Sequence, residues 1–397
     1  MHREDFPILN SDLIYFDNGA TTMKPKQVID SVVDYYSNYT ANAHRGDYDN
    51  SLKVDIKYEE VRTKVKKFIG CDNEKEVIFT SGTTDSLNRI VFGYMKYYLK
   101  SGDEVLITKA EHASNILPWL ELEKEIGISV KYIPLDNLLV TVENVKNSIT
   151  DRTKVISLAH ITNVLGDTRP IEEIGKLCRD SNILFVVDGA QSVPHIKVNV
   201  QELNIDFLAF SAHKMLGPTG VGVLYGREEL LEKMKPISFG GGMNASFLST
   251  GEVEYKSLPS RLEAGTPNIA GVIGMGAAID YLENIGIDNI TKHERHLKEY
   301  FLDKVKDIKE LVIYNKNTPG SLVAFNIDGV FSQDTAIYLN HYKICIRAGN
   351  HCAKILKEDL LVKNTCRISF YLYNTEEEID KLVEVLRNSK DIFKVVL

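Results

Sequence analysis

The sequence predicts an α/β fold with a mostly parallel sheet, on two observations. From about residue 76 to 226, short apolar runs alternate with segments of helical pattern. Such runs, separated by helices, are typical of βαβ units and of strands buried on both faces of a sheet. Beyond residue 285 the order of strands and helices changes, which favours a smaller α+β domain at the C-terminal end.

The apolar runs give the expected strands in order: 77–79, 105–107, 130–133, 155–158, 183–187, 207–210 and 221–224. A helical pattern over 269–285 leads out of this sheet. The small domain is expected to contain strands over 321–327, 344–348 and 365–373 and a helix over 376–389. We therefore expect a large domain of residues 15–284 and a small domain of residues 1–14 and 285–397.

Composition narrows the function classes. The chain has 397 residues, 44% hydrophobic and 26% charged, with a net charge of -8, which argues against a broad nucleic-acid surface. Residues 1–5 include two acids where a secretory signal would have a basic start and a long apolar core, and no apolar stretch is long enough to span a membrane. We expect a cytoplasmic protein that binds neither nucleic acid nor membrane. The five cysteines form no CxxC pair, so neither a metal site nor a disulfide framework is expected.

A lysine and an acid follow two of the expected strands. Lys214 closes the run 211–214 after the strand at 207–210, and Asp188 directly follows the strand at 183–187. Because ligands of such sheets bind at the carboxyl ends of the strands, both side chains are expected in one pocket. This pair suits pyridoxal phosphate, whose aldehyde a lysine holds as a Schiff base and whose pyridinium nitrogen an acid holds protonated. The alternatives are a capping Asp and a surface Lys before a turn.

Residues 80–84 follow the strand at 77–79 and precede a helical pattern, so their amides and hydroxyls suit a phosphate. A plain helix N-cap is the alternative. Ser211 and His213 nearby favour the phosphate. Two further side chains follow strands: His112 is placed to lie over a planar ring, and Asn163 to reach cofactor or substrate. A structural histidine and an Asx turn are the alternatives.

Cys352 lies in the polar, glycine-containing loop 347–353, together with an arginine and a histidine. Neighbouring positive charge favours the thiolate that a nucleophile needs. We interpret Cys71, Cys178 and Cys345 as small buried apolar residues instead. Arg367, at the start of a small-domain strand, is suited to grip a carboxylate, with a surface arginine as the alternative.

Several motifs together resemble a known family. They lie in order over nearly the whole chain, at residues 15–22, 42–46, 81–84, 111–119, 160–166, 188–192, 211–222, 261–267 and 347–353 and at Arg367. The chain resembles fold-type-I pyridoxal phosphate enzymes of the class V aminotransferase family, and specifically cysteine desulfurases of the SUF type, or group II.

The resemblance implies a role for each candidate residue. Lys214 would hold the cofactor, Asp188 its pyridine nitrogen and Gln191 its phenolic oxygen, with His112 over the ring. The phosphate ligands would be Thr83, Thr84, Ser211 and His213, joined by Thr266 from the other subunit of a homodimer. Cys352 would accept the sulfur. The substrate would be bound by Asn163 and Arg367, with His44, Arg45 and Arg347 at the entrance.

The implied reaction converts L-cysteine to L-alanine and leaves sulfur on Cys352 as a persulfide, for iron-sulfur cluster assembly or other sulfur trafficking through a protein acceptor. The alternatives are a lyase acting on L-selenocysteine, a class V aminotransferase or epimerase with a structural Cys352, and a catalytically silent protein that keeps the fold. Two positions depart from the family. Asn350 stands where many relatives have a second His. Gln333 precedes Asp334 where relatives that hand sulfur to a zinc-containing acceptor carry a His.

Overall fold

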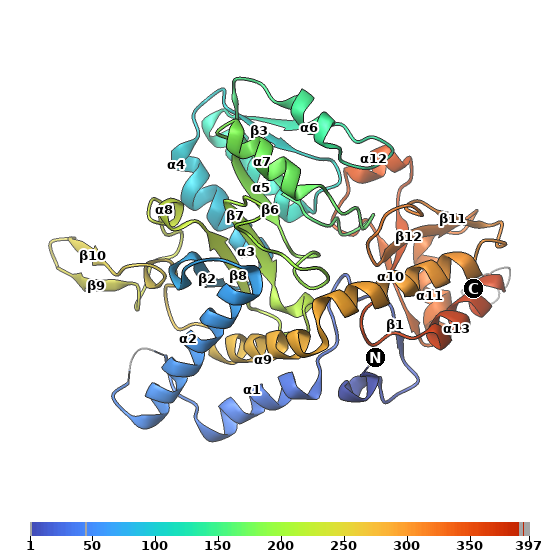
Figure 1. Cartoon of the computed structure of the whole chain (residues 1–397), viewed down its shortest axis with the longest axis horizontal. Coiled ribbons are helices and arrows are strands. Elements are labelled where there is room, and N and C mark those ends of the chain that lie inside the picture. Colours follow the sequence, from blue (N-terminus) through green and yellow to red (C-terminus); the bar gives the residue numbers. More distant parts are fainter. Residues whose placement is uncertain (1, 44–45, 389–391, 393–397) are drawn as a thin grey trace.

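The computed structural model describes residues 2–43, 46–388 and 392. A central sheet, mostly green in Figure 1, lies beside a smaller sheet in orange and red. The central sheet has seven strands in the order β2-β8-β7-β6-β5-β3-β4. Their bounds are β2 Val77–Thr80, β3 Glu104–Ile107, β4 Ser129–Tyr132, β5 Thr153–Ala159, β6 Leu184–Asp188, β7 Phe207–Ser211 and β8 Gly222–Gly226.

The predicted class, α/β with a mostly parallel sheet, is confirmed. Strands β3 to β7 pair in parallel, whereas β8 runs antiparallel to both β2 and β7. The exception has a simple cause. Residues 212–221 between β7 and β8 are too few for a helical crossover, so β8 must return in the opposite direction.

Helices cover both faces of the central sheet. Alternate residues of β6, Phe185 and Val187 on one side and Val186 on the other, belong to two different apolar clusters. One cluster packs against α1 (Lys26–Asn38), α2 (Asp49–Ile69), α6 (Val142–Ser148), α7 (Ile171–Asp180) and α9 (Ile269–Ile285). The other packs against α3 (Thr83–Asn88), the π-helix Arg89–Met95, α5 (Leu117–Ile126) and α8 (Glu228–Leu231); the short α4 (Lys96–Tyr98) continues the π-helix. Because helices cover both faces of the sheet, the strands are continuous apolar runs in the sequence.

Helix α9 needs its glycines for packing. A Cβ at Gly276 would lie 2.5 Å from Val61 of α2, and one at Gly274 would lie 2.5 Å from Pro218. Gly274 and Gly276 therefore allow close packing of α9 at the base of the molecule in Figure 1.

The smaller sheet is antiparallel, with four strands in the order β11-β12-β15-β14. Its strands are β11 Leu311–Ile313, β12 Leu322–Ile327, β14 Arg347–Gly349 and β15 Thr365–Ser369. The helices of this part are α10 Ile287–Lys304, α11 Ser332–His341, α12 Leu356–Leu360 and α13 Glu376–Arg387. The limits that we expect for the two domains stay a prediction.

Three details differ from the expected elements. The strand expected over 344–348 is two strands, because β13 (Ile344–Cys345) pairs with β1 (Ile14–Tyr15) while β14 pairs with β15. Strand β15 ends at Ser369, and residues 370–373 are buried outside any strand. A hairpin of β9 (Asn244–Phe247) and β10 (Val253–Tyr255), which the sequence analysis missed, projects from the left of Figure 1. Its strands are mostly exposed, so they lack the apolar pattern of a core strand.

No helix in the described ranges is long and apolar enough to cross a membrane.

Candidate active site

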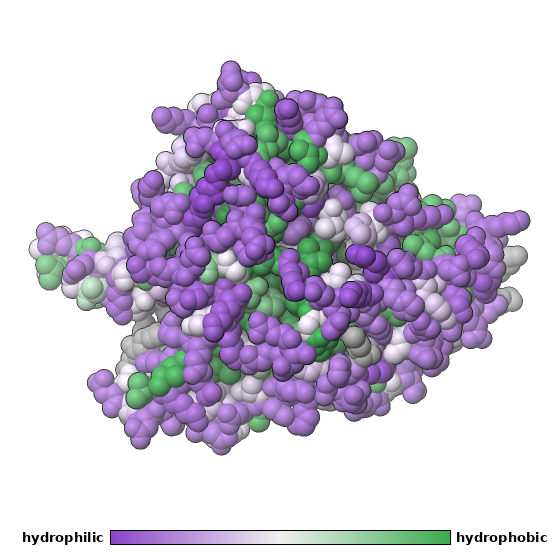
Figure 2. All heavy atoms as spheres, viewed as in Figure 1, coloured by the Kyte–Doolittle hydropathy of each residue, from purple (hydrophilic) through white to green (hydrophobic). Residues whose placement is uncertain are grey.

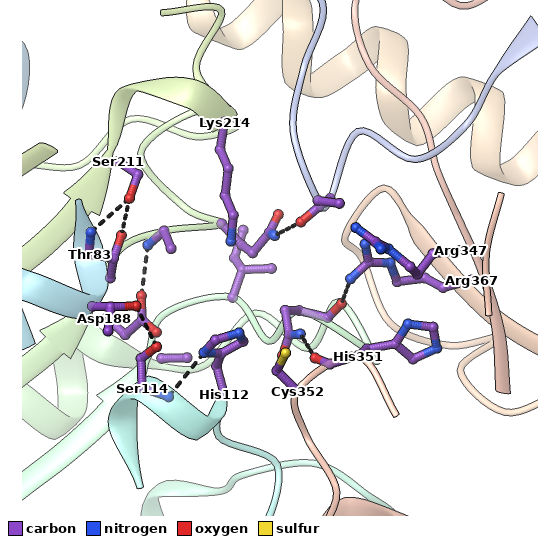
Figure 3. A pocket seen from close by; sticks show the side chains of 18 of the residues that line it. Thr83, His112, Ser114, Asp188, Ser211, Lys214, Arg347, His351, Cys352 and Arg367 are labelled. Carbon is purple, nitrogen blue, oxygen red and sulfur yellow. Dashed lines mark hydrogen bonds between the residues drawn. The ribbon is translucent and has the colours of Figure 1, made fainter. Parts of the chain in front are cut away.

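A cavity of about 490 Å³ opens where strands β5, β6 and β7 end, facing the small sheet. Most of the predicted site residues line it, although they come from both parts of the chain. In Figure 3, Lys214 extends toward the centre of the cavity, with Thr83, Ser211 and Asp188 on one side and Cys352, Arg347 and Arg367 on the other. The predicted residues in its wall are Thr83, Thr84, His112, Asn163, Asp188, Gln191, Ser211, His213, Lys214, Arg347, Cys352 and Arg367.

The phosphate-binding prediction concerns the loop before α3. The Thr83 amide donates to Ser211 Oγ at 2.7 Å, and the hydroxyls of the same two residues lie 2.7 Å apart. A Cβ at Gly82, whose φ is 149°, would lie 3.2 Å from Ser211 Oγ, so the loop approaches β7 closely. Helix α3 has no side-chain N-cap bond, so the N-cap alternative is wrong. The hydroxyls and amides gathered here fit a phosphate.

Burial shifts the pKa values of Asp188 and Lys214. Asp188 is 4% exposed and accepts a hydrogen bond from the Ala190 amide at 2.9 Å. Burial raises the pKa of Asp188 to about 6, and burial lowers the pKa of Lys214 to about 8 although Asp188 opposes that shift. A carboxylate at the base of the cavity is thus placed to bind a protonated ring nitrogen, and the lysine can give up its proton near neutral pH.

His112 is held in one tautomer. Its Nδ1 accepts a hydrogen bond from the Ser114 amide at 3.1 Å, so the ring proton of the neutral form is on Nε2. Burial, followed by the charges of Lys214 and Arg367, lowers the pKa of His112 to about 4. The ring in the cavity is therefore a neutral hydrogen-bond donor.

Glu111, which the sequence analysis gave no role, fixes the His112 loop to the sheet. This fully buried carboxylate pairs with Arg169 and accepts from Thr108 Oγ1 at 2.7 Å, Asn115 Nδ2 at 2.9 Å and the Ala159 amide at 2.7 Å. The Ala159 bond ties the loop to the end of β5. The position of this acid, directly before His112 and just after the strand at 105–107, was the available signal.

The Cys352 loop is tightly anchored, and Cys352 itself is exposed. His351 and Cys352 adopt left-handed conformations, with φ values of 52° and 55°. Asn163 Nδ2 donates to the His351 carbonyl at 2.6 Å, and the Ala113 amide donates to the Cys352 carbonyl at 2.7 Å. The sulfur-bearing residue is therefore fixed beside the His112 loop.

The expectation that His351 supplies positive charge to the thiol is wrong. Its Nε2 lies 2.9 Å from the Thr365 carbonyl, which can only accept, so Nε2 carries the proton. Burial, followed by the charges of Arg367 and Lys357, lowers the pKa of His351 to about 2. The ring is neutral and serves to hold the loop, which leaves Arg347 and Arg367 as the cations on this side of the cavity.

The two arginines share one partner, Asp17. Arg367 Nη2 lies 3.2 Å from Asp17 Oδ1, and Arg347 Nε lies 3.2 Å from Asp17 Oδ2. Arg367 also donates from Nη1 to the Asn163 carbonyl at 2.7 Å, and its burial excludes the surface-arginine alternative. A Cβ at Gly19 would lie 3.0 Å from the guanidinium of Arg367, so a larger residue there would press on this side chain. The sequence analysis named the segment 15–22 but gave Asp17 no role.

Some predictions fall outside the cavity. Thr266 does not line the cavity. Its hydroxyl instead accepts a hydrogen bond from Asn42 Nδ2 at 3.4 Å. His44 and Arg45 lie outside the described residues. Cys71 and Cys178 are buried as expected, but Cys345 is half-buried, because it ends the short strand β13 near the surface. Within the described ranges no group of three His, Cys, Asp or Glu side chains could hold a metal ion.

These residues fit pyridoxal phosphate: a lysine, a buried acid, a hydroxyl-rich cradle and a cavity of suitable size. Gln191 adds a buried Oε1 that has no partner among the described residues, while its Nε2 donates to the Gly19 carbonyl at 2.7 Å. Fold and site thus define a fold-type-I pyridoxal phosphate protein. The family model "Aminotransferase class-V" matches residues 14–382, and the chain belongs to the class-V aminotransferase family.

Several similar proteins of this family are cysteine desulfurases. A probable cysteine desulfurase of Halalkalibacterium halodurans is 44% identical over 98% of this chain and 97% of its own length. The apo structure of a cysteine desulfurase from Thermococcus onnurineus NA1 matches with a TM-score of 0.94 at 37% identity, covering 97% of this chain and 96% of that one. The cysteine desulfurase CsdA of Escherichia coli, in an S-sulfonic acid form, gives a TM-score of 0.93 at 35% identity, with 98% of both chains covered.

Proposed function

We propose that this protein is a cysteine desulfurase that converts L-cysteine to L-alanine and takes the sulfur onto Cys352 as a persulfide. One observation carries the proposal: a single cavity contains Lys214, Asp188 and an exposed cysteine. The reaction is balanced without an added oxidant, because L-cysteine and the Cys352 thiol give L-alanine and the Cys352 persulfide. The carbon–sulfur bond of the substrate breaks as the sulfur–sulfur bond forms.

Pyridoxal phosphate, when bound, supplies an electron sink for negative charge on the substrate Cα. Lys214 would hold it, Asp188 would bind its ring nitrogen and Gln191 its ring oxygen. Its phosphate would be bound by Thr83, Thr84, Ser211 and His213. In a homodimer, the partner subunit's Thr266 would be a further phosphate ligand. That Thr266 lies outside the cavity of its own chain supports the last assignment.

The substrate carboxylate would bind Arg367, whose buried Nε has no partner among the described residues. It would also bind Asn163 through the second N–H of Nδ2, since only one N–H is used in the bond to the His351 carbonyl. With a pKa lowered to about 8 by burial, Lys214 can remove the Cα proton near neutral pH and later return it. The Nε2–H of neutral His112 can donate a hydrogen bond or a proton to groups in the cavity.

Cys352 would then attack the substrate sulfur. Its exposure disfavours the alternatives in which this cysteine is structural, since such residues are usually buried. We further propose that the persulfide passes to a separate protein acceptor, in iron-sulfur cluster assembly or another sulfur pathway. The SUF-type, or group II, assignment and a cytoplasmic location belong to the same proposal.

Mass spectrometry after brief exposure of the holoenzyme to L-cysteine tests this function. We expect one additional sulfur atom on the peptide that contains Cys352, with release of L-alanine. Cys345→Ala, the matched control at the half-buried cysteine, should gain the same sulfur, whereas Cys352→Ala should not. L-Alanine release at the full rate by Cys352→Ala would contradict the proposal and favour the selenocysteine lyase alternative.

A further inference from the structure

Lys298 is a buried cation that the proposed function does not use. It lies on α10 and is 3% exposed. Burial lowers its pKa to about 8, so the side chain is mostly charged at pH 7. In the described part of the chain, its hydrogen bonds go to carbonyl and hydroxyl oxygens and none goes to a carboxylate. Burying an ammonium without an acid is costly, so its oxygen partners are essential to its position.

The oxygen partners of Lys298 belong to a single turn, residues 315–318, which precedes β12. Nζ donates to the Thr318 carbonyl at 2.6 Å, to Thr318 Oγ1 at 2.9 Å and to the Asn315 carbonyl at 3.3 Å. These bonds use all three donors of the ammonium. The charge of Lys298 therefore fixes this turn against α10.

The turn binds the Asn163 loop, residues 162–166, at the Leu165 carbonyl. Thr318 Oγ1 donates to this carbonyl at 2.7 Å and Asn315 Nδ2 donates to it at 2.6 Å, so both of its lone pairs are used. Because the Thr318 hydroxyl accepts from a cation, it is polarised and donates more strongly. The position of the Leu165 carbonyl thus depends on the charge of Lys298.

Asn163 connects this loop to the site of sulfur transfer. Its carbonyl accepts from Arg367 Nη1 at 2.7 Å, and its Nδ2 donates to the His351 carbonyl at 2.6 Å, directly before Cys352. Figure 3 shows Arg367, His351 and Cys352 on one side of the cavity and Thr83 of the phosphate cradle on the other. A shift of the Asn163 loop would therefore disturb the substrate and cysteine side and spare the phosphate side.

We propose that Lys298 is a positioning residue of the active site: through Thr318 it fixes the Leu165 carbonyl, and it thereby holds Asn163 in place for substrate binding and for the bond to the Cys352 loop. This inference deepens the proposed function and rests on it. A misplacement of about 1 Å caused by a distant change can slow a reaction about a hundredfold, so a support outside the cavity can control the rate. A merely structural Lys298 would affect the stability of the fold alone.

Lys298→Met tests the inference in the holoenzyme, because Met keeps an unbranched apolar chain and has no donor. We expect wild-type cofactor content and cofactor absorbance. The affinity for L-alanine, titrated through that absorbance, should fall about tenfold, and the single-turnover gain of sulfur by Cys352 at saturating L-cysteine should slow about threefold or more. Lys292→Met, at an exposed lysine of the same helix, makes the same change in net charge and should match the wild type in both measurements.

Thr318→Val removes only the bridging hydroxyl and keeps the inference testable if Lys298→Met does not fold. It should show the same losses, and the double variant should be no worse than the worse single variant, because both act on the Leu165 carbonyl. Ile379→Val, a core change on α13, measures the effect of lower stability alone and should keep the wild-type affinity.

An affinity for L-alanine within about twofold of wild type in both Lys298→Met and Thr318→Val would overturn the inference. An equal loss of affinity in Ile379→Val would overturn it as well, since lost stability would then explain the result. Failure of the proposed function would be distinct, because the wild type itself would gain no sulfur on Cys352 while still binding L-alanine.

Discussion

At the residue scale, burial sets the protonation of the site more than neighbouring charge does. Lys214, His112 and His351 all have lowered pKa values with burial as the largest cause. Each group is thereby pushed toward its neutral form. A neutral lysine has the free lone pair that accepts a proton, and a neutral imidazole has one nitrogen that accepts and one that donates, so this environment suits proton transfer at Cα.

Replacing Lys214 with Ala tests the central role of this residue. We expect Lys214→Ala to lose L-alanine formation by at least about a hundredfold, because the base for the Cα proton is gone. Some cofactor should remain bound through the phosphate ligands. Lys233→Ala, at an exposed lysine, should turn over normally. The assignment of Lys214 is wrong if the variant forms L-alanine at near the wild-type rate.

His160 gives a pH-dependent contribution to stability. Burial, followed by the charge of Arg169, lowers its pKa from 6.5 to about 4. Between these values the unfolded state binds a proton that the folded state does not, so this contribution is complete above pH 6.5 and is lost as the pH falls toward 4.

Relative to His160→Asn, the free energy of unfolding of the wild type should therefore fall by up to about 3 kcal/mol over that window. Urea unfolding at several pH values measures the difference between the two proteins. The exposed His341→Asn serves as the control. A difference between wild type and His160→Asn that does not vary with pH would contradict the buried, neutral state of His160.

At the element scale, the connection from β14 to β15 determines how far the sulfur can move. It contains Cys352 and the short α12, and it is anchored by the bond of the His351 ring to Thr365. Lys357, which is buried, donates from Nζ to the Thr365 hydroxyl at 2.7 Å. A short, anchored loop has little reach, so a persulfide on Cys352 stays close to the cofactor site.

We therefore expect slow turnover with L-cysteine alone, limited by removal of the sulfur from Cys352. A protein acceptor or a small thiol reductant should accelerate the steady rate markedly. Single-turnover and steady-state measurements, made side by side, check this. If the first equivalent of L-alanine forms no faster than later ones, or if no acceptor or reductant raises the steady rate, removal of the sulfur is not limiting.

At the scale of the whole molecule, exposed apolar side chains indicate a contact surface. On α1, Ile29, Val33 and Tyr36 are exposed on one helical face, and Leu52 and Ile56 are exposed on α2. Figure 2 shows apolar atoms at the lower left, over α2. Because such patches mark association sites, they support the homodimer that we propose.

Disruption of this surface should weaken both association and cofactor binding. We expect Val33→Asp to shift the protein toward monomer and to lower its cofactor content, since the partner subunit's Thr266 would no longer complete the phosphate site. Sedimentation and cofactor absorbance measure the two effects. Val312→Asp, an exposed change on β11, is the control. A wild-type protein that is a stable monomer saturated with cofactor would exclude this role of Thr266.

The sequence by itself determined the fold class, most strand positions and the two residues placed to bind the cofactor, Asp188 and Lys214. These follow from local patterns: Asp188 comes directly after an apolar run, Lys214 lies four residues after another, and the ends of such strands meet at one edge of a sheet. The motif that contains Cys352, residues 347–353, could likewise be identified from neighbouring residues in the sequence. For these features, the order of residues along the chain is sufficient.

Only the tertiary structure decided how distant groups meet. Asp17 and Arg367 are far apart in sequence, and their contact depends on the N-terminal segment lying against β15. The neutral state of His351 depends on burial and on a bond to Thr365, not on its neighbours in sequence. The position of Thr266 outside the cavity depends likewise on chain path. Charge balance and protonation arise from three-dimensional packing, which a linear pattern does not contain.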